Sequence, residues 1–164
     1  MQRKGHCRCG ITQAQTKHRF LWRRHHPATA AEDLIRIFQT LEHTFDLEPA
    51  AEITTEANPD TVDAEYFKKL KAAGFNRVSI GMQSAVPSVL ATLERSHKPE
   101  NVALAIAGAK AAGLNTSLDL IYGAPGETLE QWQTSIQEAI SLNPDHISAY
   151  ALIVEDGTKL ATAN

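Results

Sequence analysis

The sequence predicts an α/β fold, a partial (β/α) barrel with parallel strands, on three observations. From about residue 30 onward, apolar runs typical of buried strands alternate with amphipathic helical segments. The strand–helix unit recurs every ~30 residues, as expected of successive βαβ units. Helical crossovers of this kind place successive strands parallel. The 164-residue chain shows only four such strands, whereas a complete eight-stranded barrel requires about 250 residues.

The first elements follow from apolar spacing and from residues that end helices and strands. Apolar residues recur at helical spacing over 30–47. The β-branched run 53–55 favours a short strand, which an Asn-Pro pair ends. Asp60 or Thr61 is expected to cap the next helix, over 62–74, which a glycine closes.

The same sequence signals predict the remaining strands and helices. Proline and glycine mark the start and end of the longest alanine-rich segment, as they do in helices. We expect a strand over 77–84, a short helix over 86–94, a helix over 99–113, a strand over 114–123, a helix over 127–142 and a strand over 146–154. The helix over 127–142 is expected to turn Leu129, Trp132, Ile136, Ala139 and Ile140 inward. The edge strands are as apolar as the interior strands, which predicts self-association through exposed strand edges.

The charge of the chain is unevenly distributed. Residues 1–31 contain seven of the 16 Lys and Arg residues and none of the 19 Asp and Glu residues. The acidic remainder argues against nucleic-acid binding by the main body. Residues 1–29 have no clean period and form an irregular basic segment, and residues 30–164 form the predicted domain. The sequence contains no apolar run long enough for a transmembrane segment, and its two cysteines are too few for a disulfide framework, which predicts a cytoplasmic protein.

Polar side chains follow the predicted strands at one edge of the sheet. Glu56 and Gln83 end the first two strands, Asp119 lies in the third, Ala151 in the fourth, and Arg95 in the loop after the short helix. The carboxyl ends of parallel strands meet at one rim, where the sites of such folds form. Carboxylates and an amide suit ribose hydroxyls and an amino group, and an arginine suits a carboxylate. The set therefore matches a nucleoside attached to an amino acid. The alternative is that each residue serves a turn or a helix cap.

Four motifs carry a resemblance to a known family. They are "EITTEANPDTVD", "RVSIGMQSAVPSVLATLERSHKPE", "TSLDLIYGAPGETLEQWQTSI" and "PDHISAYALIVEDGTKL". Over about residues 31–160 the chain closely resembles the radical S-adenosylmethionine (radical SAM) family. The specific match is to the oxygen-independent coproporphyrinogen III oxidase-like branch, which includes the heme chaperones. The uninterrupted series of motifs is more similar to the heme chaperones than to the oxidase.

The resemblance implies a function, a set of cofactors and roles for the strand-end residues. Proteins of this family bind a [4Fe-4S] cluster and S-adenosylmethionine (SAM), which they cleave to a 5′-deoxyadenosyl radical. By motif, Glu56 and Arg95 would bind the methionine end, Gln83 and Asp119 the ribose hydroxyls, and Ala151 the adenine through its backbone. The branch acts in porphyrin biosynthesis or in heme delivery, so heme or a heme-accepting protein is an implied partner.

The cluster motif of the family, C-x3-C-x2-C, is absent from this sequence. Cys7 and Cys9 form a C-x-C pair, and a [4Fe-4S] cluster requires three suitably spaced thiolates. We therefore predict that the chain is a truncated radical SAM core domain, an oxidoreductase by family that is inactive alone. One alternative is a cluster-free module that binds SAM or heme. Another is an ordinary (β/α) enzyme in which Glu56 and Asp119 act as an acid–base pair.

The coding DNA tests a frame-shift origin for residues 1–29. The family carries a Phe-Gly-Gly-Gly-Thr-Pro strand end where this chain has "LWRRHHP", and the codons TTT GGC GGC GGC ACC read as Trp-Arg-Arg-His in a neighbouring frame. We expect sequencing of the upstream DNA to find the Gly-Gly-Gly-Thr and cysteine motifs in that frame. A genuine basic arm is the alternative, and a neighbouring frame without either motif would establish it.

Overall fold

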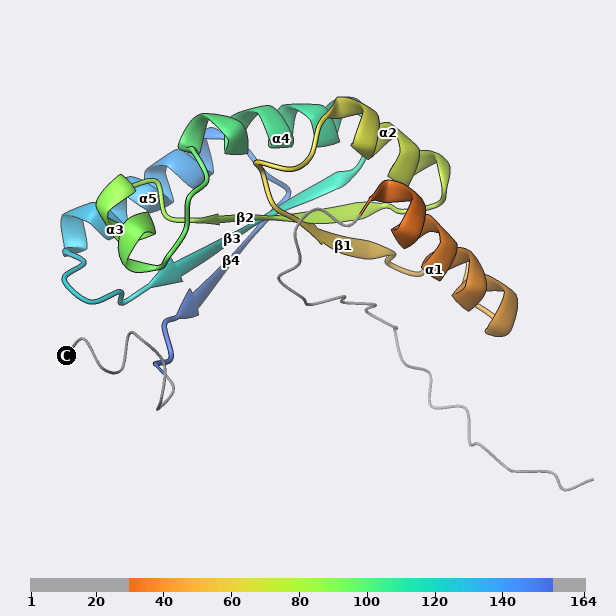
Figure 1. The fold of residues 1–164 in the computed structure, drawn as a ribbon, viewed down its shortest axis with the longest axis horizontal. Helices are drawn as coiled ribbons and strands as arrows, with labels where there is room; N and C mark the ends of the chain where they lie inside the picture. Colours follow the sequence, from red (N-terminus) through yellow and green to blue (C-terminus); the bar gives the residue numbers. More distant parts are fainter. Residues whose placement is uncertain (1–29, 155–164) are drawn as a thin grey trace, which may run out of the picture.

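A four-stranded parallel sheet with helices packed against it forms the core of the protein. The computed structural model describes residues 30–154, and the predicted segments 1–29 and 155–164 lie outside the described residues. In chain order the elements are α1 (Ala31–Thr44), β1 (Thr54–Ala57), α2 (Ala64–Ala72), β2 (Arg77–Gln83), α3 (Pro87–Thr92), α4 (Pro99–Ala111), β3 (Asn115–Tyr122), α5 (Leu129–Ser141) and β4 (His146–Ala151). The strands pair in the order β1-β2-β3-β4, all parallel. Figure 1 shows α2, α4 and α5 on one side of this sheet. The predicted α/β class and the parallel strand arrangement are confirmed.

Side chains alternate between the two faces of the sheet. In β2, Val78, Ile80 and Met82 are buried against the helices. Their counterparts in β3, Leu118 and Leu120, are equally buried. Because successive strand residues point to opposite faces, the residues between them face away from the helices. We call this second surface the open face, since no helix of the described part of the chain covers it in Figure 1.

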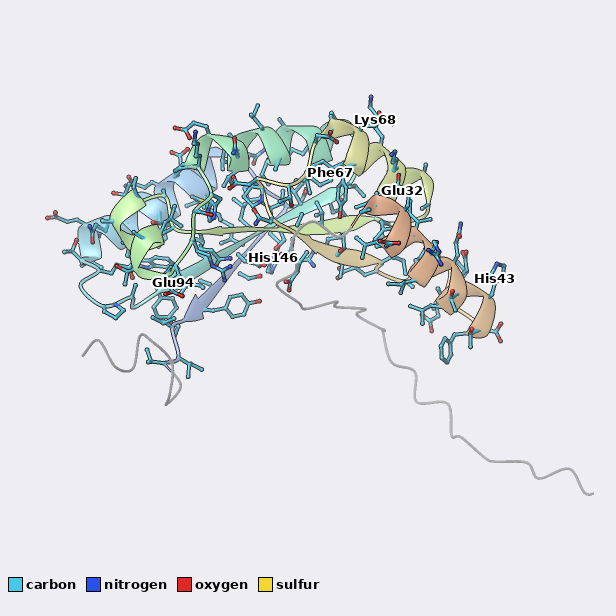
Figure 2. The ribbon with its side chains drawn as sticks, viewed as in Figure 1. Glu32, His43, Phe67, Lys68, Glu94 and His146 are labelled. Atoms are coloured by element: carbon cyan, nitrogen blue, oxygen red, sulfur yellow. The ribbon has the colours of Figure 1, made fainter. Side chains whose placement is uncertain are left out.

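Helices α2 and α4 pack closely against each other on the helical side of the core. Phe67 of α2 is fully buried, and Figure 2 shows it between the helices and the sheet. A Cβ atom at Gly108 of α4 would lie 3.3 Å from Phe67 Cδ2. The small residues of α4, which include the buried Ala105 and Ala109, therefore allow the two helices to approach. The alanine-rich composition that predicted the helix also determines how closely it packs.

The start of α2 differs from the prediction that Asp60 or Thr61 caps it. The N-cap residue is Asp63, whose side chain accepts a hydrogen bond of 2.7 Å from Tyr66 N. Asp60 instead accepts a bond of 2.8 Å from Asn101 Nδ2. Thr61 donates its hydroxyl to a backbone carbonyl of the preceding turn. Three neighbouring residues that all suit an N-cap compete here, and the tertiary contact with α4 removes Asp60 from that role.

Helix α5, beside the β4 edge of the sheet, buries fewer of its apolar side chains than the sequence predicts. Trp132 packs against the core, with its ring centroid 5.3 Å from that of Tyr122. Leu129 and Ile140 of the same helix are 70% and 60% exposed, so the inward orientation predicted for these two residues is wrong. The helix packs against β3, and β4 has no further strand beside it among the described residues. Self-association through this edge stays a prediction.

The beginnings of β3 and β4 are joined by a side chain. Asp145 Oδ2 accepts hydrogen bonds from Thr116 N, at 2.7 Å, and from Thr116 Oγ1, at 2.9 Å. These donors lower the pKa of the Asp145 carboxyl below its ordinary value. The bonds align the two strands before their ladder begins at the Ser117–His146 pair.

Within residues 30–154, no helix has both the length and the apolar character needed to cross a membrane.

A capping box at the start of α5 allows a direct test of the local contribution to stability. Thr128 Oγ1 accepts from Gln131 N, and Gln131 Oε1 accepts from Thr128 N. We expect Thr128→Ala to lower the free energy of unfolding by about 1 kcal/mol, because a backbone donor loses its partner. The matched control is Thr134→Ala in the exposed middle of the same helix, with an expected change within about 0.5 kcal/mol. Urea denaturation followed by circular dichroism measures both, and equal losses would contradict the prediction.

Candidate functional site

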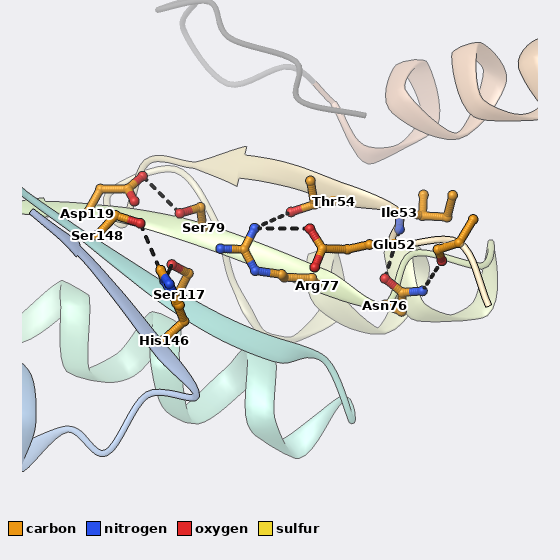
Figure 3. A network of polar contacts seen from close by, with 11 residues as sticks. Glu52, Ile53, Thr54, Asn76, Arg77, Ser79, Ser117, Asp119, His146 and Ser148 are labelled. Atoms are coloured by element: carbon orange, nitrogen blue, oxygen red, sulfur yellow. Dashed lines mark hydrogen bonds and ion pairs between the residues drawn. The ribbon is translucent and has the colours of Figure 1, made fainter. Parts of the chain in front are cut away.

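The open face of the sheet is polar, which sets it apart from the apolar face under the helices. Figure 3 shows part of this face, with Asp119 beside Ser79 and Arg77 beside Thr54. Its polar residues are Thr54 and Glu56 from β1, Arg77, Ser79 and Gln83 from β2, Ser117 and Asp119 from β3, and His146, Ser148 and Tyr150 from β4. Figure 2 places His146 on the opposite side of the sheet from Phe67. A surface of this composition suits a polar ligand.

Asp119 is the central acidic group of this surface. Its Oδ2 accepts a hydrogen bond of 2.9 Å from the hydroxyl of Ser79 on the neighbouring strand. Ser79 is only 4% exposed, whereas Asp119 is half-buried. The carboxylate is therefore held in a defined orientation by a buried donor while part of it faces solvent. A carboxylate fixed in this way is suited to accept hydrogen bonds from ligand hydroxyls.

Gln83 ends β2 in an unusual backbone conformation. Its φ angle is 61°, and the β2–β3 register shifts between Gly81 and Gln83. A Cβ atom placed on Gly81 would lie 2.8 Å from Gln83 Nε2, so the amide group of Gln83 lies over this glycine. Gly81 is the register partner of Asp119. The amide and the carboxylate predicted to share a site are thus brought to the same part of the open face.

The other predicted site residues lie in β1, in β4 and in the loop after α3. Glu56 is the register partner of Ser79 and is half-buried on the same face. Ala151 ends β4 as the register partner of Tyr122 and is exposed. Arg95 follows α3, where its backbone N–H donates to Leu90 O at 2.8 Å. Glu56 and Ala151 thus lie in the last two residues of their strands, and Arg95 lies in the loop after a helix. The ligand-binding roles of all three stay predictions.

The loop after β3 is closed by a carboxylate that the sequence analysis did not select. Glu127 Oε2 accepts hydrogen bonds from Gly123 N, at 2.7 Å, and from Ala124 N, at 3.2 Å. Gly123 and Gly126 have φ angles of 79° and 78°, which glycine adopts without strain. A Cβ atom on either glycine would meet nothing within 4 Å. The loop is therefore held in shape from within and leaves open space at the rim.

The opposite end of the open face is occupied by an ion pair. Arg77 is only 8% exposed, and its NH1 group lies 3.6 Å from Glu52 Oε1 and donates to Thr54 Oγ1 at 3.2 Å. Figure 3 shows this contact at a distance from Asp119, toward the start of the strands. A buried arginine in such a pair is costly to disrupt. We assign this end of the face to structure and the strand-end rim to the site.

Ser79 and Glu127 are the groups that the sequence analysis missed. Ser79 shares the alternation of Gly81 and Gln83, so the period of the strand places it on the correct face. Nothing in the sequence, however, indicates that Asp119 on the next strand is its hydrogen-bond partner. For Glu127 the only sequence signal is its place in a glycine-rich loop.

The described residues do not supply a site for a metal cluster. Among residues 30–154, no group of three or more His, Cys, Asp or Glu side chains is arranged to hold a metal ion. This part of the chain contains no cysteine, and Cys7 and Cys9 lie outside the described residues. A [4Fe-4S] cluster needs thiolate ligands, so the described residues do not fit that group. The two carboxylates and the amide on the open face suit a ligand with hydroxyl and ammonium groups instead.

Comparison with protein families and curated proteins gives a consistent result. Residues 21–139 match the model of the radical SAM superfamily. The protein named heme chaperone HemW from Mycobacterium tuberculosis H37Rv is 47% identical over 131 residues, which cover 79% of this chain and 34% of that protein. The HemW protein of Escherichia coli K12 is 44% identical over 109 residues, or 66% of this chain and 29% of the relative. The chain thus spans about a third of the length of the curated relatives it matches.

Solved structures share the fold. The coproporphyrinogen III oxidase HemN from Escherichia coli, described as a radical SAM enzyme, aligns with a TM-score of 0.69 and 29% identity, over 75% of this chain and 29% of that one. The methyltransferase TsrM from Kitasatospora setae, solved with cobalamin and a [4Fe-4S] cluster, aligns with a TM-score of 0.65 and 19% identity. The second alignment covers 79% of this chain and 24% of TsrM, and it supports the fold alone.

Proposed function

Because the chain belongs to the radical SAM superfamily, we propose that the strand-end rim of its open face binds S-adenosylmethionine. The observation that carries the proposal is the assembly around Asp119. The carboxylate is oriented by Ser79 at 2.9 Å and lies beside Gly81, over which the amide of Gln83 is folded. Three different positions of two adjacent strands thus converge on one polar spot at the carboxyl ends of the strands, where sites of parallel α/β folds form.

In this proposal Asp119 and Gln83 bind the ribose hydroxyls. A carboxylate accepts hydrogen bonds only, so it suits two vicinal hydroxyl donors, and the amide can both donate and accept. Ala151 contributes backbone groups to the adenine ring from the end of β4. The open space above Gly123 and Gly126 leaves room for a ligand at the rim.

Glu56 and Arg95 bind the amino-acid end of the ligand in this proposal. The α-ammonium group of methionine calls for a carboxylate, and its carboxylate calls for a guanidinium group, which can bind it with two parallel hydrogen bonds. Glu56 lies two strands away from Asp119, with β2 between them, and is in register with Ser79 of β2. The ligand would therefore extend along the rim, from β1 at its methionine end toward β4 at its adenine end.

The cluster chemistry belongs outside the described residues. In radical SAM proteins a [4Fe-4S] cluster supplies the electron for reductive cleavage of SAM. Residues 30–154 hold no thiolate for it, so no reaction step is assigned to them. These residues bind and orient the nucleoside and the amino acid.

For the whole protein of which such a domain is part, we propose heme handling. The support is the name heme chaperone carried by relatives up to 47% identical to this chain. The second support is the 29% identical structure of the Escherichia coli coproporphyrinogen III oxidase HemN. The oxidase and the chaperone functions remain two candidates, of which the higher identity favours the chaperone.

Ligand titration tests the SAM pocket without need of a cluster. We expect isothermal titration calorimetry of the 164-residue chain to detect S-adenosylhomocysteine binding. Asp119→Ala should weaken that binding about 10- to 100-fold, because a charged hydrogen-bond acceptor is lost. The control Asp33→Ala removes an exposed aspartate of α1 that pairs with Arg36 at 3.8 Å and should leave the affinity unchanged. Absence of binding, or equal affinity of both variants, would refute the proposed pocket.

Absorbance titration with heme tests the second part of the proposal. We expect a saturable Soret shift in the whole protein and the same S-adenosylhomocysteine affinity with and without heme, because the rim of the open face is assigned to the nucleoside. A heme titration without saturation would argue for the oxidase candidate. Competition between the two ligands would contradict the assignment of the rim.

A further inference from the structure

We propose that His97 and Ser135 are positioning residues that hold the chain segments before and after Gln83 and thereby direct its amide to the rim. The inference rests on the proposed SAM pocket and deepens it. Both residues are buried, at 8% and 0% exposure, and neither lies on the open face. They come from the loop between α3 and α4 and from the middle of α5, which are far apart in the sequence.

Gln83 needs such support because of its backbone conformation. Its φ of 61° lies in the left-handed region, which residues other than glycine, asparagine and aspartate seldom adopt. Ser84 N donates to Met82 O at 2.7 Å, so the hydrogen bond spans Gln83 alone. A bond of this span around a residue with positive φ corresponds to the rare, strained class of γ-turn. Strained conformations of this kind persist only where the surrounding structure maintains them.

The peptide group before Gln83 is held by His97. Its Nε2 lies 2.8 Å from Met82 O, and since a carbonyl only accepts, Nε2 carries the proton. Met82 itself is 1% exposed and packs in the apolar core. The same carbonyl therefore receives both the turn-closing bond from Ser84 N and the bond from His97. This arrangement stops the carbonyl from rotating to the orientation that a regular strand would require.

The segment after Gln83 is held by Ser135. Its hydroxyl lies 2.9 Å from Ser84 Oγ and accepts a hydrogen bond of 3.1 Å from Ala85 N. Ser84 Oγ in turn accepts from Val86 N at 3.1 Å. Ser84 and Ser135 are both almost completely buried, at 1% and 0% exposure. Two hydroxyls thus anchor the three residues that follow Gln83 to a helix on the far side of the sheet.

With the turn held in this way, the side chain of Gln83 folds back over Gly81. Its Nε2 lies within 2.8 Å of the position that a Gly81 Cβ would take, next to the strand position of Asp119. In an extended strand the side chain would continue along the rim rather than fold back over residue 81. The two anchors on either side of the turn therefore decide whether amide and carboxylate share one ligand.

Double-mutant cycles on the 164-residue chain test the inference. We expect His97→Leu and Ser135→Ala each to weaken S-adenosylhomocysteine binding about five- to tenfold, as for one lost hydrogen bond. In a Gln83→Ala background the same changes should weaken binding less than twofold, because no amide remains to be positioned. His97→Gln retains an N–H donor and should restore affinity to within about threefold of the wild type. Control variants are His43→Leu and Ser141→Ala, both exposed, which should change nothing.

A ligand-free measurement separates this inference from the SAM proposal. Backbone NMR couplings should report a left-handed φ for Gln83 in the wild type and in His97→Gln, and an extended φ in His97→Leu and Ser135→Ala. If the wild type binds no S-adenosylhomocysteine, the SAM proposal fails and this measurement alone decides the inference. A left-handed φ in all variants, or equal affinity losses in both Gln83 backgrounds, would overturn it. A variant that does not fold would assign its residue to the fold rather than to positioning.

Discussion

The two-residue repeat of side chains along β2 and β3 is the constraint on which the site depends. It sends Val78, Ile80 and Leu118 into the core under the helices. The same repeat places Ser79 and Asp119 on the open face, in contact at 2.9 Å. A one-residue shift in register would exchange the two sets and place carboxylates in the core. Burial of the apolar set therefore also determines the positions of the polar set, and the stability of the core and the geometry of the site have one cause.

Side chains outside the sheet then shape the carboxyl ends of the strands. Glu127 holds the loop after β3 through two backbone N–H groups. His97 and Ser135 hold the turn around Gln83 from the helical side. Most of these bonds join a side chain to backbone, so they fix where the chain runs rather than what it binds. A binding surface made of half-buried polar groups needs such support, because its own side chains contribute little to packing.

The polar residues of the described part of the chain agree with its place in the radical SAM superfamily. Residues 30–154 contain polar groups suited to a nucleoside and an amino acid, and they contain no cysteine. The family model begins at residue 21, and the curated relatives are about three times as long as the matched segment. We therefore propose ligand recognition for the described part of the chain. Redox chemistry would need ligands that these residues do not contain.

The sequence alone determined the fold class, the order of the elements and the strands that carry Glu56, Gln83 and Asp119, because periodicity and turn residues act locally. It did not determine that Asp63 caps α2, since Asp60 is recruited by a contact 41 residues away. It also did not reveal that Leu129 and Ile140 are exposed rather than turned inward, since their exposure depends on which elements pack against α5. Only the tertiary structure decided that Ser79 orients Asp119 and that Gln83 adopts a positive φ. Register and long-range hydrogen bonds set those features, and no local pattern encodes them.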